Sequence, residues 1–225
     1  MQYHIDTGLI YEKFKENGEC PLCEIEKKAQ EQFVYEFLND AVMEDDSRIS
    51  VAKHGFCEKH FDALFSGKNK LSVALQVLSR CDAIEDLVAP VKSAGKAKAR
   101  AAEILKAKDD CVICDLLNKS MEKYYKTIAQ MFVKEREFFR LLYSSKGFCM
   151  KHYAELLRFS SHAFPMQKEY LKTLSEVQKK NFDKIKTDLK AFCDSHDYRN
   201  AYKPLGESET ALPRIRTRLY GKKPE

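Results

Sequence analysis

Six of the eight cysteines in this chain belong to two similar patterns that each also contain a histidine. Each pattern has a Cys-x-x-Cys pair and then a Gly-Phe-Cys-x-Lys-His hexapeptide, with 33 or 34 residues between the second and third cysteines. Cysteine sulfur and imidazole nitrogen are the usual ligands of closed, tetrahedral zinc sites. The sequence therefore predicts two Cys3His zinc sites with these ligands: Cys20, Cys23, Cys57 and His60 in the first, and Cys111, Cys114, Cys149 and His152 in the second.

The spacing inside each pair suits a single bound ion. Ligands three residues apart at the start of a helix lie about one turn apart and can reach the same metal. Gly55 and Gly147 precede the hexapeptide cysteines by two residues and allow backbone angles that other residues avoid. We expect each Cys-x-x-Cys pair to share its ion with the next hexapeptide along the chain. Zinc would then hold together the two ends of a helical hairpin, with a binding energy of roughly 10–16 kcal/mol.

Other uses of these cysteines remain open at this point. They could be buried apolar side chains, a thioredoxin-like redox pair or the ligands of an iron–sulfur cluster. A redox Cys-x-x-Cys normally follows a strand in a βαβ unit, and no such pattern is present. Cys81 lies outside both patterns, and Cys193 forms an isolated Cys-x-x-His with His196. We interpret both as core or helix-end residues.

The elements that would position these ligands are helices. Apolar residues recur at helical spacing along most of the chain, and period-2 strand patterns are absent, so we predict an all-α fold. Two tandem units are expected, at residues 1–90 and 111–196, each with its own zinc site. An Ala/Lys-rich helix at 91–110 would connect them, and 197–225 would be an irregular basic tail. One expected helix starts after Asn69, with an apolar stripe formed by Leu71, Val73, Ala74, Val77, Leu78, Cys81, Ile84, Leu87 and Val88.

Charge is distributed unevenly along the chain. The net charge of +5 combines −7 for residues 1–91 with +12 for residues 92–225. Basic residues that could bind a polyanion are Lys96, Lys98, Arg100, Arg214, Arg216 and Arg218. No apolar run approaches the roughly 18–20 residues that a membrane span needs, and the N-terminus has no signal-peptide pattern. We therefore expect a cytoplasmic protein that does not enter membranes and whose thiols stay reduced.

Several segments together resemble one known family. These are YHIDT (3–7), ECPLC (19–23), GFCEKHFDALF (55–65), KNKLSVALQ (68–76), DYRN (197–200) and ALPR (211–214). The chain resembles an uncharacterised bacterial family catalogued only as a domain of unknown function, and the resemblance covers nearly its whole length. It implies a bacterial, cytosolic protein and supplies no activity.

The function that we favour from the sequence is binding. A non-catalytic, zinc-binding helical protein with two Zn²⁺ ions would act as a protein–protein adaptor for an unknown partner. Alternatives are nucleic-acid or ribonucleoprotein binding through the basic C-terminal half, and a thiol-based redox or zinc-responsive switch. An enzyme is less favoured, because each zinc would already have four protein ligands and no nucleophile triad or phosphate-binding loop is present.

Overall fold

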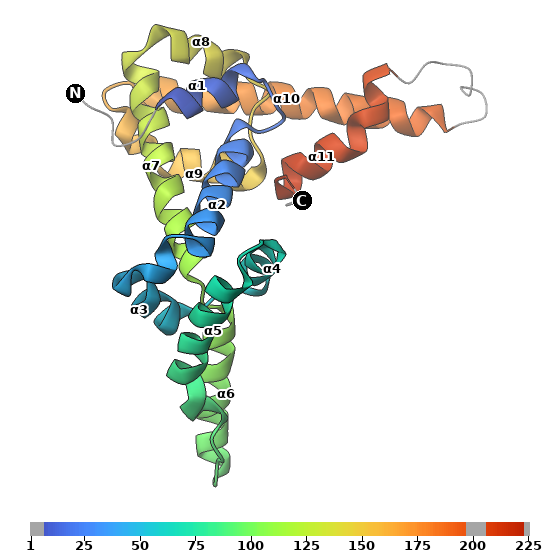
Figure 1. Ribbon diagram of the computed structural model, residues 1–225. Coiled ribbons are helices and arrows are strands. Elements are labelled where there is room, and N and C mark those ends of the chain that lie inside the picture. Colours follow the sequence, from blue (N-terminus) through green and yellow to red (C-terminus); the bar gives the residue numbers. More distant parts are fainter. Residues whose placement is uncertain (1–6, 197–205, 223–225) are drawn as a thin grey trace. The chain divides into compact units, whose positions relative to one another are not determined.

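The computed structural model describes residues 7–196 and 206–222, and every regular element in these ranges is a helix. The predicted all-α fold is thereby confirmed. The α-helices shown in Figure 1 are α1 (Thr7–Lys15), α2 (Pro21–Leu38), α3 (Asp45–His54), α4 (Glu58–Ser66), α5 (Lys70–Ile84), α6 (Ala94–Asp109), α7 (Val112–Lys134), α8 (Arg136–Ser144), α9 (Met150–Arg158), α10 (Gln167–Ser195) and α11 (Ala211–Tyr220). The described residues also form the 3₁₀ segments η1 (Ala41–Met43), η2 (Glu85–Val88), η3 (Ser160–Ala163) and η5 (Gly206–Thr210).

The chain divides into two compact units. Unit 1 contains residues 1–27 together with 121–225, and unit 2 contains residues 28–120. Unit 2 is therefore one continuous segment that interrupts unit 1, whereas the tandem expectation had boundaries at residues 90, 110 and 196. Both boundaries between the units fall inside long helices, one within α2 and the other within α7.

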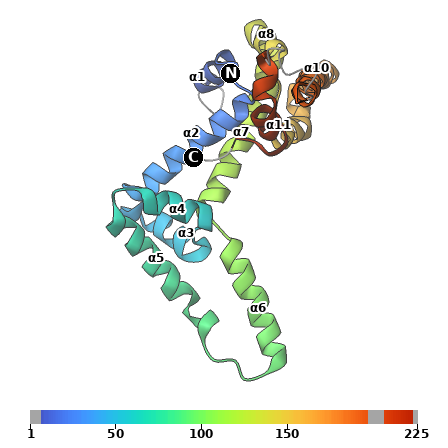
Figure 2. The same ribbon diagram turned by 90° about the vertical axis from the view of Figure 1, so that its right-hand side faces the viewer.

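The core of unit 2 is small and lies between the end of α2, α3, α4, α5 and the start of α7. Its buried residues are Phe37, Ala41, Val51, Leu64, Val73, Cys111, Val112 and Ile113. The side chains of Ser72 and Gln76 on α5 both donate hydrogen bonds to the carbonyl of Phe37, at 3.0 and 2.7 Å. This carbonyl lies at the end of α2, where helical carbonyls lack partners within the helix. Figure 2 shows the chain turning between α5 and α6 within this unit.

Helix α5 begins as the sequence indicates but does not bury the whole predicted stripe. Asn69 caps the helix by accepting a hydrogen bond from the backbone N–H of Ser72. Val73 is buried, whereas Leu71 and Leu78 are 69% and 58% exposed. The stripe is too wide for one side of a helix, so only the side that faces α3 is covered.

Unit 1 has an aromatic core between α1, α7, α8 and α10. The ring of Phe138 is fully buried and lies 5.0 Å from that of Phe14, while the Phe132 and Tyr170 rings are 5.1 Å apart. Figure 1 shows α11 returning along α10.

The described part of the C-terminal tail is helical, which differs from the irregular tail that we expected. Pro213 and Gly206 had indicated irregular backbone. Pro213 occupies the third position of α11, where an N–H has no partner within the helix and proline is tolerated. Arg218 then lies in the last turn and is 4% exposed. The DYRN segment and Pro204 lie outside the described residues. No helix in the described ranges is both long and apolar enough to cross a membrane.

Candidate metal centres

The eight predicted ligands form two clusters, but each cluster combines residues from both sequence patterns. Centre A consists of Cys20, Cys23, Cys149 and His152, and centre B of Cys57, His60, Cys111 and Cys114. Within each cluster the ligand atoms all lie within 4.8 Å of one another. The ligand sets are therefore Cys3His as predicted, whereas the predicted grouping by neighbouring motifs is wrong.

Helix length explains this exchange of partners. The 18 residues of α2 extend about 27 Å away from the Cys20–Cys23 turn, and the ten residues of α3 that follow cover only about 15 Å. The hexapeptide that contains Cys57 therefore stays beside the end of α2, where the Phe37 and Phe56 rings are 5.5 Å apart. In the same way, α7 has 23 residues and α8 only nine, so Cys149 does not return to the start of α7.

Centre A lies entirely in unit 1. His152 Nδ1 is 3.4 Å from Cys20 Sγ, 3.5 Å from Cys23 Sγ and 3.2 Å from Cys149 Sγ. The Sγ atoms of Cys23 and Cys149 are 3.7 Å apart. All four residues are buried, with exposed fractions of 6% or less.

Centre B lies entirely in unit 2 and has nearly the same dimensions. His60 Nδ1 is 3.3 Å from Cys57 Sγ, 3.3 Å from Cys111 Sγ and 3.4 Å from Cys114 Sγ. The Sγ atoms of Cys57 and Cys114 are 3.8 Å apart. His60 and Cys111 are buried, while Cys57 and Cys114 are partly exposed.

These distances match those around a single tetrahedral zinc ion. With Zn–S near 2.3 Å and Zn–N near 2.0–2.1 Å, tetrahedral angles separate two sulfurs by about 3.8 Å and a sulfur from a nitrogen by about 3.6 Å. The sulfur–sulfur distances in both centres are far longer than the roughly 2.05 Å of a disulfide, and all eight cysteines are free. Both centres can therefore hold one metal ion each.

Burial of thiols in both clusters also favours a bound cation. Burial raises the pKa of the Cys20 thiol well above its ordinary value. In centre B, burial together with the neighbouring thiols Cys111 and Cys57 raises the pKa of Cys114 to about 12. Three thiolates cannot share such a small buried volume unless a cation compensates them. Burial lowers the pKa of His60 to about 4, so its imidazole is neutral at pH 7, as metal binding requires.

The two hexapeptides place their ligands in the same way. Cys57 and Cys149 each stand at the N-cap of a helix, α4 and α9, with identical backbone angles of φ −70° and ψ 162°. Gly55 and Gly147 have φ values of 67° and 85°, in the region that favours glycine. This confirms the predicted role of both glycines.

A side chain from a neighbouring helix binds the backbone within or just before each hexapeptide. In unit 1, Gln178 on α10 accepts from the backbone N–H of Phe148 at 3.0 Å and donates to its carbonyl at 2.9 Å. In unit 2, Arg80 on α5 donates to the carbonyls of Ala52 and Lys53. A Cβ atom on Gly55 would lie 2.8 Å from Arg80 Nε, so glycine there also makes room for this arginine.

The surroundings of the two imidazoles differ. His152 Nε2 lies 3.3 Å from a carboxylate oxygen of Glu26, which is also paired with Lys151. A carboxylate on the distal nitrogen fixes a metal-binding imidazole and makes it a better ligand. His60 Nε2 is buried without a hydrogen-bond partner among the described residues. Glu26 was not among the predicted site residues, although its position one helical turn after Cys23 was a usable signal.

The C-terminal helix covers centre A. A Cβ atom on Gly221 would lie 3.6 Å from Cys23 Sγ and 3.9 Å from Cys149 Sγ, so the end of α11 lies directly against two ligands. Arg218 contacts Glu19 through Nε at 3.1 Å and Nη2 at 3.0 Å, and Arg214 Nε lies 3.3 Å from the same carboxylate. These ion pairs hold α11 beside the turn that begins at Cys20.

The candidate polyanion-binding residues are only partly available. Arg214 and Arg218 are engaged with Glu19, and Arg100 contacts Glu103 and the carbonyl of Asp86. The remaining residues, Lys96, Lys98 and Arg216, are exposed.

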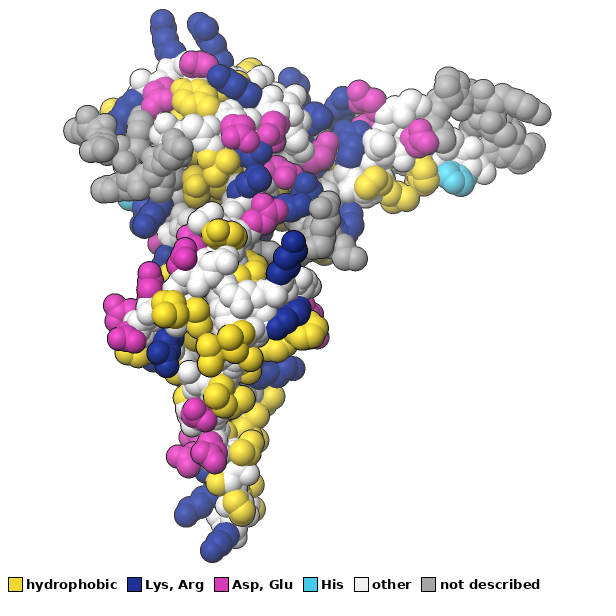
Figure 3. Space-filling model, viewed as in Figure 1, with side chains coloured by type: hydrophobic (Ala, Val, Ile, Leu, Met, Phe, Trp, Pro, Cys, Tyr) yellow, Lys and Arg dark blue, Asp and Glu magenta, His cyan; other side chains and the backbone are white. Residues whose placement is uncertain are grey.

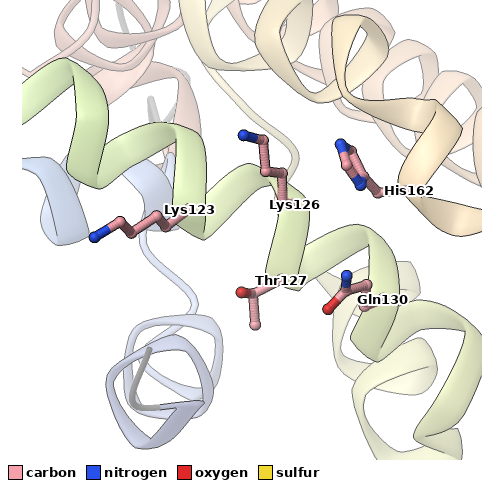
Figure 4. A pocket seen from close by; sticks show the side chains of 5 residues that line it. All are labelled: Lys123, Lys126, Thr127, Gln130 and His162. Atoms are coloured by element: carbon pink, nitrogen blue, oxygen red, sulfur yellow. The ribbon is translucent and has the colours of Figure 1, made fainter. Parts of the chain in front are cut away.

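A cavity of about 390 Å³ in unit 1 offers little for catalysis. It is lined by Lys123, Lys126, Thr127 and Gln130 of α7 and by His162 of η3. Figure 4 shows that the amine of Lys123 points away from His162, so these groups do not converge on one point. A third group of potential metal ligands in unit 2 consists of His54, Asp110 and Asp115, in which His54 Nδ1 lies 2.9 Å from a carboxylate oxygen of Asp110.

Comparison with known proteins gives a family and one relative. The model of a family described as "Family of unknown function (DUF6062)" matches residues 1–225. An "Uncharacterized 23.9 kDa protein in xynA 3'region" from Caldicellulosiruptor sp. (strain Rt8B.4) is 25% identical over 200 residues, which cover 86% of this chain and 89% of the relative. No solved structure matches the chain.

Proposed function

This chain belongs to the DUF6062 family of unknown function, and from its own residues we propose that it binds two zinc ions and acts as a non-catalytic helical adaptor. The observation that carries the proposal is the pair of Cys3His clusters, in which sulfur–sulfur distances of 3.7 and 3.8 Å suit one tetrahedral ion per cluster. With four protein ligands each, both ions would be structural, since catalytic zinc keeps an open position.

Zinc suits these clusters better than an iron–sulfur cluster does. Ligands of a polynuclear cluster are spread around several metal atoms, whereas all ligand atoms of each centre lie within 4.8 Å of one another. Thiol ligands of this kind are available in a reducing compartment, which supports the cytoplasm as the location.

Metal analysis of the purified protein tests the proposal. Wild-type protein should contain two zinc ions per chain, and Cys81→Ala, which removes an exposed thiol outside both centres, should also contain two. Because Cys57 and Cys111 share centre B, the double variant Cys57→Ala/Cys111→Ala should retain one ion. The double variant Cys20→Ala/Cys57→Ala removes a ligand from each centre and should retain none. Iron in place of zinc contradicts the proposal. So does a result in which Cys57→Ala/Cys111→Ala retains no ion while Cys20→Ala/Cys57→Ala retains one.

The adaptor role is supported by the surface of unit 2. Most of the large apolar side chains that are exposed in the described chain belong to this unit, among them Ile104 and Leu105 on α6, which are 43% and 63% exposed. Large apolar side chains that are exposed together on one surface often mark protein–protein contact sites. Nucleic-acid binding has weaker support, because Arg214 and Arg218 are committed to Glu19.

A comparison of captured proteins tests the adaptor role. A protein recovered from cell extract with wild-type chain should be lost with Ile104→Lys/Leu105→Lys and retained with Leu212→Lys, which changes an exposed leucine of unit 1. Equal recovery with both variants would argue against unit 2 as the binding surface.

A further inference from the structure

Helix α5 has apolar residues on the side that its own unit does not cover. Leu71, Leu75 and Leu78 are 69%, 48% and 58% exposed and lie at spacings of four and three residues, so they form one stripe along the helix. The opposite side carries Val73 and Gln76, which are buried against unit 2. Apolar residues on both sides of a helix indicate that both sides are covered.

The stripe continues onto α4. The rings of Phe61 and Phe65 are stacked with centroids 6.3 Å apart, and Phe65 is 59% exposed. Lys70 Nζ lies 4.1 Å from the centroid of the Phe65 ring, which brings this aromatic pair next to the start of α5. Figure 3 shows hydrophobic side chains gathered over α5 and the helices beside it. We call these five residues, Phe61, Phe65, Leu71, Leu75 and Leu78, the α4–α5 face.

The charges at the two ends of α5 indicate what covers this face. Lys68 and Lys70 stand at its N-terminal end, and Asp82, Glu85 and Asp86 at its C-terminal end, all of them exposed. This order opposes the helix dipole, which favours acidic residues at the start of a helix and basic residues at its end. Within the described residues none of the five takes part in a salt bridge. Within a single chain these five charges therefore do not stabilise α5.

An antiparallel copy of the same helix complements both features. We propose that two copies of this chain associate through their α4–α5 faces, with the α5 helices antiparallel about a two-fold axis near Leu75. Asp82 lies seven residues after Leu75, about 10 Å along the helix, and Lys68 lies seven residues before Leu75, just ahead of the Asn69 N-cap. The axis therefore brings the Lys68 end of one α5 beside the Asp82 end of the other, twice in the dimer, while the leucines form the apolar seam. Two-fold pairing of one surface with itself is the commonest arrangement of soluble oligomers.

The mass of the intact, zinc-loaded protein in solution tests this pairing. Sedimentation velocity in the micromolar range should give twice the 26.1 kDa of one chain. Leu75→Lys puts two like charges on the axis and should give monomers, whereas Leu212→Lys on α11 should remain dimeric. Circular dichroism and zinc content should be unchanged in both variants. A monomeric wild-type protein, or a dimer that survives Leu75→Lys, overturns the proposal.

A charge exchange tests the antiparallel orientation. Lys68→Asp and Asp82→Lys each turn two attractive contacts into repulsive ones and should weaken the dimer about tenfold or more. The double variant Lys68→Asp/Asp82→Lys restores opposite charges at both contacts and should return the dissociation constant to near the wild-type value. If the double variant forms a weaker dimer than both single variants, the antiparallel arrangement is refuted.

The inference depends on the proposed function only in that centre B holds α4 beside α5. Zinc analysis of the same samples distinguishes a failure of that function, in which zinc is absent, from a failure of pairing, in which zinc is present and the protein is monomeric.

Discussion

A chelator should remove the ion of centre B well before that of centre A. In centre A all four ligands are buried and the backbone of Gly221 lies against two of their sulfurs. In centre B, Cys57 and Cys114 are partly exposed, so a competing ligand can reach them directly. Unequal access should therefore give two phases of metal release, each with an amplitude of one ion per chain.

The size of the difference follows from the contact between Glu26 and His152. Loss of a carboxylate that supports a metal-bound imidazole typically weakens metal binding 10–100-fold, and His60 has no such partner among the described residues. Centre A should therefore hold its ion at least about tenfold more tightly than centre B. This contribution equals about 1.4–2.7 kcal/mol.

A chromogenic chelator in excess provides the assay. Cys57→Ser should abolish the fast phase, and Glu26→Gln should accelerate the slow phase about tenfold or more. Glu24→Gln is the matched control, because Glu24 is a neighbouring carboxylate on α2 that pairs with Lys222 and not with a ligand. A single phase with an amplitude of two ions, or a slow phase that Glu26→Gln leaves unchanged, would refute the reasoning.

Three further predictions concern stability. Arg218→Ala should lower the free energy of unfolding by about 1–3 kcal/mol in urea titrations, because it removes one of the two arginines that pair with the largely buried Glu19 carboxylate. The exposed Arg158→Ala should change it by less than about 1 kcal/mol. Gly55→Ala should destabilise the protein by about 1–3 kcal/mol, because residue 55 has a positive φ and the added Cβ atom would meet Arg80. In Gly95→Ala on α6 the added Cβ atom has no neighbour within 4 Å, so this variant should stabilise the protein by about 0.5–1 kcal/mol. Removing both metal ions with a strong chelator should abolish cooperative thermal unfolding, measured by circular dichroism, and restoring zinc should recover it.

Much of this structure could be predicted from local sequence. Helical periodicity and the absence of strand patterns were sufficient for the all-α fold, and the spacing of the cysteines and histidines identified the ligand types of both clusters. Ligand spacing is a local property: it brings Cys20 to Cys23, or Cys57 to His60, wherever the rest of the chain goes. Which Cys-x-x-Cys joins which hexapeptide depends on the lengths and directions of α2, α3, α7 and α8, and no short pattern contains that information.

The remaining errors have the same origin. The stripe of α5 looked like one core face because periodicity shows that a helix side is apolar but not whether another element covers it. The helix α11 was missed because Pro213 normally marks irregular backbone, yet it falls in the first turn, where proline is tolerated. The contact between Arg218 and Glu19 joins residues at opposite ends of the chain.

The insertion of unit 2 into unit 1 has a consequence for the order of events during synthesis. The ligands of centre A span residues 20–152 of the sequence, and those of centre B span residues 57–114, which lie within that range. All of unit 2 is available for folding once residue 120 has left the ribosome, whereas the Cys20–Cys23 turn must wait for a histidine made much later. Nascent chains halted between the two points should carry a single ion, so the protein acquires its metals one after the other, from the inner loop to the outer.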